Sequence, residues 1–188
     1  ALACYRKNVD FKNEEKILEV LNKITIELKQ SEKGIRAFLN GEDVSDEIFQ
    51  PNTSRLVSIV SAFPRIRKEM VLRQKKKVEK SIDDKKSVVM EGRDIATDVI
   101  PNADIKIYLT AGVKARAQRR LDQFQDKGIK MQFEEVLRDL EERDRRDTQR
   151  AASPLRIVED AVIIDTKTDT VSETVDRVME KLKEKNLI

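Results

Sequence analysis

From residue 88 onward the chain alternates short apolar stretches with amphipathic ones, and this alternation constrains its fold more than any other feature. Apolar runs containing β-branched residues predict three buried strands, at 88–90, 105–109 and 162–165. Apolar residues at helical spacing predict the helices between and after these strands, at 113–127, at 133–148 and at 171–185, the first ended by Gly128. Strands that alternate with helices form parallel sheets, so the sequence predicts the α/β class.

The chain before residue 88 has a different pattern and predicts a small subdomain. Polar and apolar residues alternate at 23–29, and an apolar stretch at 35–39 returns after a turn from Ser31 to Gly34, which predicts a β-hairpin. A polar loop at 40–43 follows the hairpin.

Helices are expected on both sides of this hairpin. Residues 1–5 read as the end of a helix, and 14–21 form a short amphipathic one. After the hairpin a helix runs from Asn52 through Phe63, and a second runs from 65 to 79. Pro64 should separate these two, because proline cannot donate to the helix ladder.

The composition excludes several kinds of site. The chain has no histidine and one cysteine, Cys4, which rules out Ser-His-Asp triads, Cys-His pairs and zinc or cysteine clusters, so we expect no metal ligands. Charged residues make up 39% of the chain, but the net charge is only +3, so most charges are interleaved. No apolar run approaches the about 20 residues of a membrane span, and no secretory signal is recognisable. We expect a cytoplasmic protein without a membrane partner.

The predicted strand at 88–90 runs directly into Glu91-Gly92-Arg93-Asp94. Ligands of open α/β sheets bind outside the carboxyl ends of the strands. An arginine and a carboxylate side by side there can bind a phosphate and a sugar or base edge. The alternative is an ordinary strand-to-loop turn with solvated charges.

Arginines are concentrated on the two helices that follow. Arg116, Arg119 and Arg120 lie on the first, while Arg143, Asp147 and Arg150 recur at i, i+4 and i+7 around the second. A ladder of solvated ion pairs, such as Arg143 with Asp147, Asp139 with Arg143 and Glu142 with Arg146, is one interpretation. The other is phosphoryl transfer, where positioning and charge stabilisation dominate and arginines can close over phosphates.

At this point the chain resembles bacterial cytidylate kinases over almost its whole length. The motifs that support the resemblance are, in order, Gly41-Glu42-Asp43-Val44 with Glu47-Ile48, Ala62-Phe63-Pro64-Arg65-Ile66-Arg67, Glu91-Gly92-Arg93-Asp94, the helix with Arg116, Arg119 and Arg120, Glu142-Arg143-Asp144-Arg145-Arg146-Asp147 and Ala152-Ser153-Pro154-Leu155. The resemblance implies a P-loop nucleoside monophosphate kinase fold, with a parallel sheet flanked by helices and a small α+β acceptor-binding insert. The core would comprise 1–22 and 86–188, with an arginine lid at about 113–150, and the insert would comprise 23–85.

The resemblance also implies a function and site residues. The family transfers the γ-phosphoryl group of ATP, with Mg²⁺, to CMP or dCMP in pyrimidine nucleotide metabolism. The residues that match its acceptor-binding positions are Ser58, Arg67 and Asp94 for the cytosine edge, Arg93 and Arg150 for the phosphate, and Arg143 with Asp147 for the ribose. The implied catalytic residues are Arg93 and three arginines that would close on the donor phosphates, Arg116, Arg119 and Arg120.

One departure from the family affects activity. The family's first strand leads into Gly-x-x-x-x-Gly-Lys-Ser/Thr, whose amides hold the donor phosphates and whose hydroxyl binds Mg²⁺. The 188 residues contain no such string. The expectation is that the first strand and the P-loop are absent and that this chain by itself is inactive.

Two other functions remain open. A basic nucleic-acid-binding module is suggested by Lys75-Lys76-Lys77 and the arginine helices, although aromatic residues for base stacking make up only 4% of the chain. Carboxylates also match the basic residues almost one for one, which argues against nucleic acid as a partner. The other possibility is a non-catalytic fragment with no ligand of its own.

Overall fold

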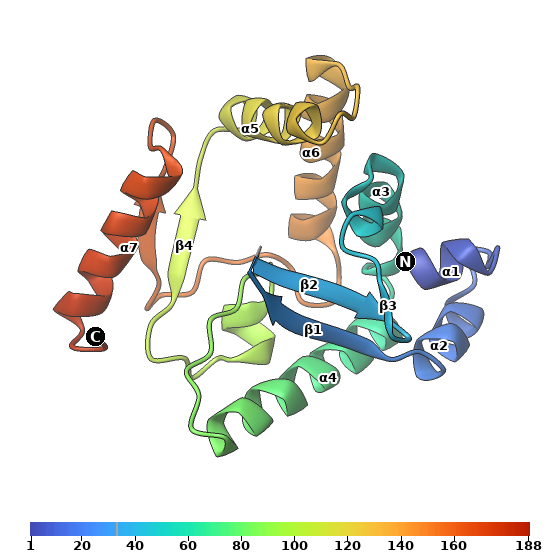
Figure 1. The fold of residues 1–188 in the computed structure, drawn as a ribbon, viewed down its shortest axis with the longest axis horizontal. Coiled ribbons are helices and arrows are strands. Elements are labelled where there is room, and N and C mark those ends of the chain that lie inside the picture. The colour runs from blue at the N-terminus through green and yellow to red at the C-terminus, as the bar shows by residue number, and fades with distance from the viewer. Residues whose placement is uncertain (33) are drawn as a thin grey trace. The chain divides into compact units, whose positions relative to one another are not determined.

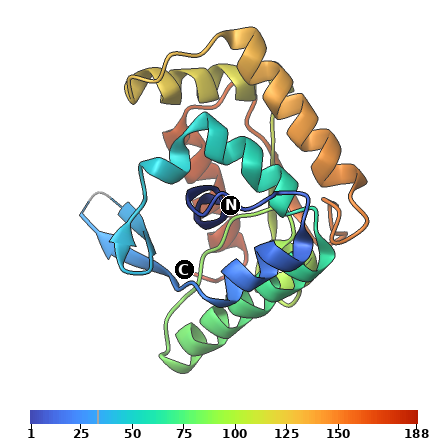
Figure 2. The ribbon, with the colours of Figure 1, turned by 90° about the vertical axis from the view of Figure 1, so that its right-hand side faces the viewer.

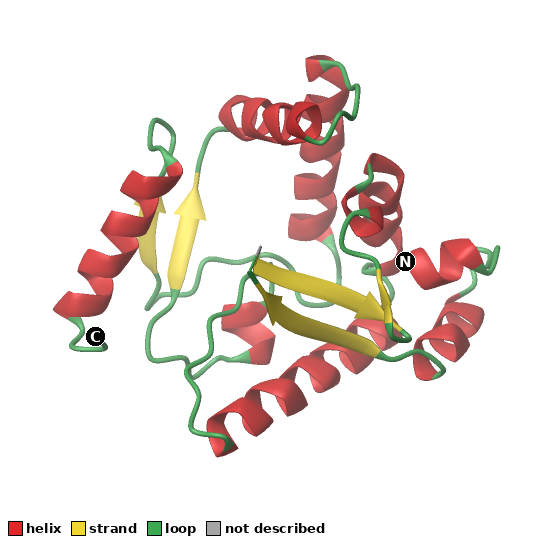
Figure 3. Ribbon diagram, viewed as in Figure 1, coloured by secondary structure: helices red, strands yellow, loops and turns green. Residues whose placement is uncertain are grey.

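The structure is a computed structural model that describes residues 1–32 and 34–188. By their contacts these residues divide into two compact units. The first comprises Ala1–Lys86 with Arg150–Ala152, and the second comprises Ser87–Gln149 with Ser153–Ile188. Each unit is described by itself, and Figures 1 and 3 show the elements of both.

The first unit combines helices with a small antiparallel sheet, which confirms the predicted α+β character. Its elements are α1 (Leu2–Arg6), α2 (Glu14–Asn22), β1 (Ile26–Ser31), β2 (Gly34–Leu39), β3 (Glu42–Asp43), the 3₁₀ turn η1 (Glu47–Phe49), α3 (Pro51–Val60) and α4 (Pro64–Asp83). The predicted hairpin is confirmed: β1 pairs with β2 from Ile26 opposite Leu39 to Ser31 opposite Gly34. The expected turn includes residue 33, which lies outside the described residues. The expected polar loop at 40–43 is partly wrong, because Glu42 and Asp43 pair with β2 as a third strand.

Proline and asparagine set the helix boundaries in this unit. Asn13 caps α2 by accepting a hydrogen bond from the backbone N–H of Lys16. Pro64 is the first residue of α4, a position where its missing N–H costs nothing, so the predicted break between two helices is confirmed. The first of them ends earlier than expected, at Val60 rather than Phe63.

Apolar residues from the helices and the hairpin form the core of the first unit. Ile17 of α2 is 1% exposed, and Ile66 of α4 and Leu39 of β2 are also buried in this cluster. Cys4 of α1 belongs to the same core. Figure 2 shows α2 beside α4, the arrangement that their contacts describe. Residues 1–22 thus pack within this unit, and their expected assignment to the kinase core stays a prediction.

The second unit contains a small parallel sheet, as the sequence predicts. Its elements are the π-helical turn η2 (Ile95–Val99), β4 (Ile107–Thr110), α5 (Val113–Asp126), α6 (Phe133–Gln149), β5 (Val162–Asp165) and α7 (Val171–Glu184). β4 and β5 pair in parallel, from Ile107 opposite Val162 to Thr110 opposite Asp165. The predicted strands at 105–109 and 162–165 are confirmed to within two residues, and so is the α/β class.

The expected buried strand at 88–90 is wrong. These residues form no ladder with any strand in the described part of the chain, and Val89 is 98% exposed. A segment becomes a strand only when its backbone N–H and C=O groups pair with those of an adjacent strand. Neither β4 nor β5 pairs with residues 88–90. The Glu91 to Asp94 segment therefore does not follow a strand of either described sheet.

α5 and α6 form a helical hairpin, seen in both Figures 1 and 2. Ala117 is fully buried and Val136 is 2% exposed, and they pack with Leu121 and Phe124. Gly128 has φ +70° and follows the end of α5, a left-handed conformation that favours glycine, so the predicted stop is confirmed. Over residues 1–32 and 34–188, no helix has the length and apolar character that a bilayer crossing requires.

Candidate functional site

Two of the predicted acceptor-binding arginines lie around one buried carboxylate in the second unit. The Nε of Arg93 donates to Oδ2 of Asp147 at 3.1 Å, although 54 residues separate them. The Nε of Arg143, one turn before Asp147 on α6, lies 3.8 Å from the same oxygen. The Asp147 side chain is only 7% exposed. The structure thus brings Arg93, Arg143 and Asp147 together as the sequence predicts.

Two guanidinium groups lie beside this one carboxylate. Burial, reinforced by the nearby charge of Arg93, lowers the pKa of Arg143, while Asp147 and Asp144 act in the opposite direction. Burial and the charge of Arg143 also lower the pKa of Arg120. Guanidinium groups that disfavour each other's charge are stabilised by an added anion. Carboxylates and phosphates are the anions whose geometry such forks match.

Local geometry fixes the position of Arg93. A Cβ on Gly92 would lie 2.8 Å from Cγ1 of Ile95, so only glycine fits before Arg93 without a shift. The next turn, η2, is closed by the N–H of Asp98 donating to the carbonyl of Asp94 at 2.9 Å. Ser153 Oγ donates to Oδ1 of Asp98 at 3.0 Å, which ties this turn to the chain after α6.

The three arginines of α5 have three different surroundings. Arg116 forms a bidentate pair with Asp144 of α6, at 3.2 and 2.6 Å, and its Nε donates to the carbonyl of Ala111 at 3.0 Å. Arg120 lies over the ring of Phe124, 4.5 Å from its centre, and donates to Gln123. The Arg116 pair joins the two helices of the hairpin.

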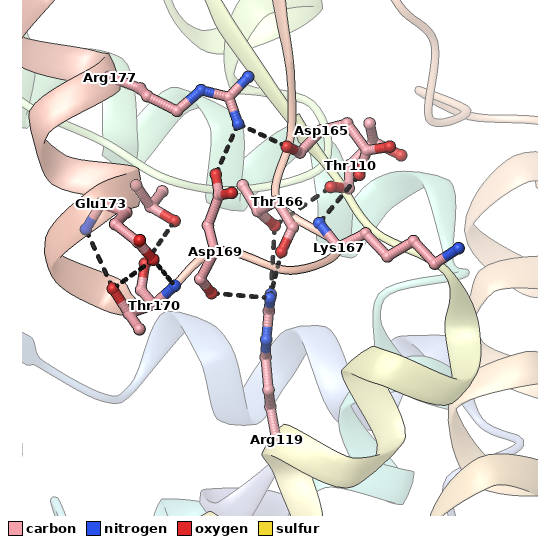
Figure 4. Close-up of polar contacts among 10 residues, drawn as sticks. Thr110, Arg119, Asp165, Thr166, Lys167, Asp169, Thr170, Glu173 and Arg177 are labelled. Carbon is pink, nitrogen blue, oxygen red and sulfur yellow. Dashed lines mark hydrogen bonds and ion pairs between the residues drawn. The ribbon is translucent and has the colours of Figure 1, made fainter.

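Arg119 points in another direction, toward the chain after β5 (Figure 4). It donates to the hydroxyl of Thr166 at 3.2 Å, to the Thr166 carbonyl, and to the Asp169 carbonyl at 3.2 Å. Thr166 directly follows β5 and therefore lies at the carboxyl end of the parallel sheet. This is the edge where α/β folds bind nucleotides.

The remaining predicted residues lie in the first unit. Ser58 is 9% exposed, and its hydroxyl donates to the carbonyl of Ser54 at 3.4 Å. Arg67 donates to the carbonyl of Ser61 at 3.1 Å, and the Ser61 hydroxyl donates to the carbonyl of Ser58 at 3.4 Å. These bonds bring Ser58 and Arg67 to the same turn between α3 and α4. Asp94 lies in the second unit beside Arg93.

Arg150 directly follows α6, which ends at Gln149, and by its contacts it groups with the first unit. Of the ion pairs expected from the alternative ladder, Glu142 with Arg146 is present. Arg143 and Asp147 are also paired, so this pair belongs to both interpretations.

Several partners were not singled out from the sequence. Asp144 sits inside the arginine-rich motif, but only the structure shows that it pairs with Arg116. In the first unit Arg6 forms a bidentate pair with Glu42, at 2.7 and 2.9 Å, and also contacts Glu47. A polar residue directly after a buried strand is a signal that could have pointed to Thr166.

The described residues contain no group of three or more carboxylate, cysteine or histidine side chains suited to a metal ion. The positively charged groups described above are arginines, which bind phosphate directly.

Comparisons with known proteins match almost the whole chain. The family model described as cytidylate kinase matches residues 1–184. A cytidylate kinase of Caldanaerobacter subterraneus subsp. tengcongensis is 43% identical over 182 residues, covering 97% of this chain and 77% of the relative. The cytidylate kinase of Bacillus subtilis is 39% identical over 184 residues, covering 98% of this chain and 80% of the relative. The chain therefore belongs to the cytidylate kinase family, a family of nucleoside monophosphate kinases.

Proposed function

We propose that this family member binds CMP and dCMP as acceptors of the γ-phosphoryl group of ATP. In this reaction an acceptor phosphate oxygen attacks the γ-phosphorus, the bond to the β,γ-bridging oxygen breaks, and ADP leaves with that electron pair. The nucleotides are the small-molecule partners. The observation that supports the proposal most strongly is the cluster of Arg93, Arg143 and Asp147.

The chemistry of the cluster suits an acceptor nucleotide. Arg93 and Arg143 carry more positive charge than Asp147 neutralises, so an incoming phosphate can pair with Arg93, with Arg150 as its second contact. Asp147 and Arg143 then remain for the ribose hydroxyls. Ser58, Arg67 and Asp94 would read the cytosine edge, and a site built to hydrogen-bond one edge leaves these groups unpaired with a wrong base.

The donor side would use the arginines of α5. Arg116, Arg119 and Arg120 would neutralise charge that develops on the transferred group, which is the main task in phosphoryl transfer. In this proposal residues of about 113–150 act as the lid and 23–85 as the acceptor-binding insert. Because the 188 residues contain no Gly-x-x-x-x-Gly-Lys-Ser/Thr string, we expect acceptor binding without turnover from this chain by itself.

Calorimetric titration tests the acceptor site. The chain is titrated with CMP, AMP, UMP and a short oligonucleotide at two salt concentrations, and selective CMP binding is expected. Arg93→Ala should weaken CMP binding by about tenfold or more, because a charge-assisted contact to the phosphate is lost. Arg146→Ala, which removes an exposed arginine paired with Glu142 on the same helix, is the matched control and should leave affinity unchanged.

Three results would contradict the proposal. Equal binding of all three monophosphates would remove base selection. Unchanged CMP affinity in Arg93→Ala would remove the assigned phosphate contact. Binding of the oligonucleotide alone, weakening steeply with salt, would favour the nucleic-acid-binding module instead.

A further inference from the structure

The loop of residues 166–170, which follows β5, is held from two sides by arginines of two different helices (Figure 4). Arg119 reaches it from α5 and Arg177 reaches it from α7. All of these residues belong to the second unit.

Thr166 anchors this loop to the sheet. Its backbone N–H donates to the carbonyl of Thr110 at 2.8 Å, and its hydroxyl donates to the same carbonyl at 3.1 Å. Thr110 is the last residue of β4, so the two bonds join the carboxyl ends of both parallel strands. The Thr166 residue is 5% exposed. The start of the loop is therefore a fixed part of the sheet edge.

The bonds from Arg119 to this loop use only some of the N–H donors of its guanidinium. A guanidinium has five N–H donors. Three bonds run from Arg119 to the loop, to the Thr166 hydroxyl, the Thr166 carbonyl and the Asp169 carbonyl. Among the described residues these are its side-chain contacts, so two N–H groups remain for a ligand. The loop thereby presents a partly bonded, oriented guanidinium at the carboxyl edge of the sheet.

Arg177 holds the far end of the loop. One of its terminal nitrogens donates to the Asp165 carbonyl at 2.6 Å and to the Asp169 carboxylate at 2.5 Å. Asp169 therefore connects the two arginines, giving its carboxylate to Arg177 and its carbonyl to Arg119. Its side chain is 16% exposed and that of Arg177 is 43% exposed, so the ion pair is open to solvent on the arginine side.

We infer that Arg177 and Asp169 are positioning residues. They keep the loop of 166–170 in the conformation that holds the Arg119 guanidinium at the edge of the sheet, where it can bind the phosphates of a donor nucleotide. Without the Arg177 contact the Asp169 carboxylate loses its ion pair, and the backbone of Asp169, whose carbonyl Arg119 uses, keeps the bond of its N–H to the Thr166 carbonyl at 3.3 Å. That bond is long, so we expect the Asp169 carbonyl to be held less firmly. A preoriented guanidinium loses less conformational entropy when it binds a phosphate than a freely rotating one. The inference rests on the proposed function for the identity of the ligand, but its structural step does not.

Arg177→Ala and Arg177→Lys of the 188-residue chain test the inference. A single terminal nitrogen makes both bonds, and the ammonium of a lysine carries the same charge but ends one bond short of it, so Arg177→Lys should give an effect between those of the unchanged chain and Arg177→Ala. Lys181→Ala is the matched control, since Lys181 lies one turn further along α7 and pairs with Glu184 of the same helix. ¹⁵N NMR reports on Arg119 directly, because hindered rotation of its guanidinium separates the Nη signals.

The expected result has two parts. In Arg177→Ala the Nη signals of Arg119 average, and the dissociation constant for MgATP, titrated to millimolar concentration, rises about fivefold to tenfold through the lost preorientation. CMP affinity stays within about twofold, because its proposed site uses other arginines. If Arg177 had only a structural role, Arg177→Ala would lower the unfolding midpoint. It would leave the Arg119 signals and the ratio of the dissociation constants for MgATP and CMP unchanged.

Contrary outcomes are separable from those of the proposed function. Unchanged Nη signals in Arg177→Ala would overturn the positioning step whatever nucleotide binds. Two results would overturn the assignment of Arg119 to donor phosphates. One is averaged Nη signals in Arg177→Ala with the same MgATP affinity as the unchanged chain, and the other is no MgATP binding by the unchanged chain or by Arg177→Ala. Loss of selective CMP binding in the unchanged chain would instead contradict the proposed function.

Discussion

At the scale of single residues, the arginine cluster depends on Asp147, whose buried carboxylate lies between two guanidinium groups. Arg93 reaches it from the loop after Gly92, and Arg143 reaches it from the preceding turn of the same helix. Burial and, after it, the nearby charge of Arg93 lower the pKa of Arg143. One carboxylate thus makes it possible for two cations to lie close together in a partly buried place.

Asp147→Asn should destabilise the chain. The amide keeps the shape of the side chain but removes the charge that compensates Arg93 and Arg143, and we expect the free energy of unfolding in urea to fall by about 2–3 kcal/mol. Glu142→Gln is the matched control on the same helix, because its pair with Arg146 is exposed, and it should cost less than about 0.5 kcal/mol. Equal effects of the two substitutions would show that Asp147 does not stabilise the cluster.

The sequence could predict part of this cluster. Arg143 and Asp147 are neighbours on a helix face, so their spacing alone brings them together. Arg93 lies 54 residues away from Asp147, and no local pattern gives that distance. The same limit applies to Arg116 and Asp144, which belong to different helices.

At the scale of elements, the α5–α6 hairpin depends on a glycine at its turn. Gly128 and Gly112 both have open space where a Cβ would stand, but only Gly128 has a positive φ, +70°. Gly128→Ala should therefore lower the free energy of unfolding by about 1 kcal/mol through backbone strain. Gly112→Ala is the control and should change it by no more than a few tenths of a kcal/mol, about the level of a neutral surface change. A larger loss in Gly112→Ala than in Gly128→Ala would contradict this account.

Helices were predicted better than strands because their signal is local. The periodicity of α5, α6 and α7 and the positions of Pro64 and Gly128 gave boundaries within one or two residues. β4 and β5 were found because each is an apolar run, and their pairing was predicted from the helices between them. For 88–90 the same kind of run gave a wrong result, since nothing within a strand's own sequence says whether a partner lies beside it.

At the scale of the whole chain, residues are grouped into units by contacts that the sequence does not display. The core of the first unit combines α1, α2, the hairpin and α4, and the second unit has its own cluster on the α5–α6 hairpin. Apolar residues also remain outside both clusters, including Leu109 at 52% and Ile163 at 57% exposure. A rule that places every β-branched run in a core therefore overestimates how much of this chain is buried.

Val89→Lys tests whether residues 88–90 are exposed, as in the structure, or form the buried strand that the sequence predicts. A side chain that is 98% exposed can be replaced by lysine with a change in the free energy of unfolding within about 0.5 kcal/mol. If 88–90 were a buried strand, the same substitution would place an ammonium in the core and cost more than about 3 kcal/mol. Ile164→Ala is the buried control in β5, where Ile164 is 2% exposed, and should cost about 2–4 kcal/mol. Urea unfolding of the two variants decides between the alternatives, because a large loss in Val89→Lys requires a partner strand that the β4–β5 sheet does not supply.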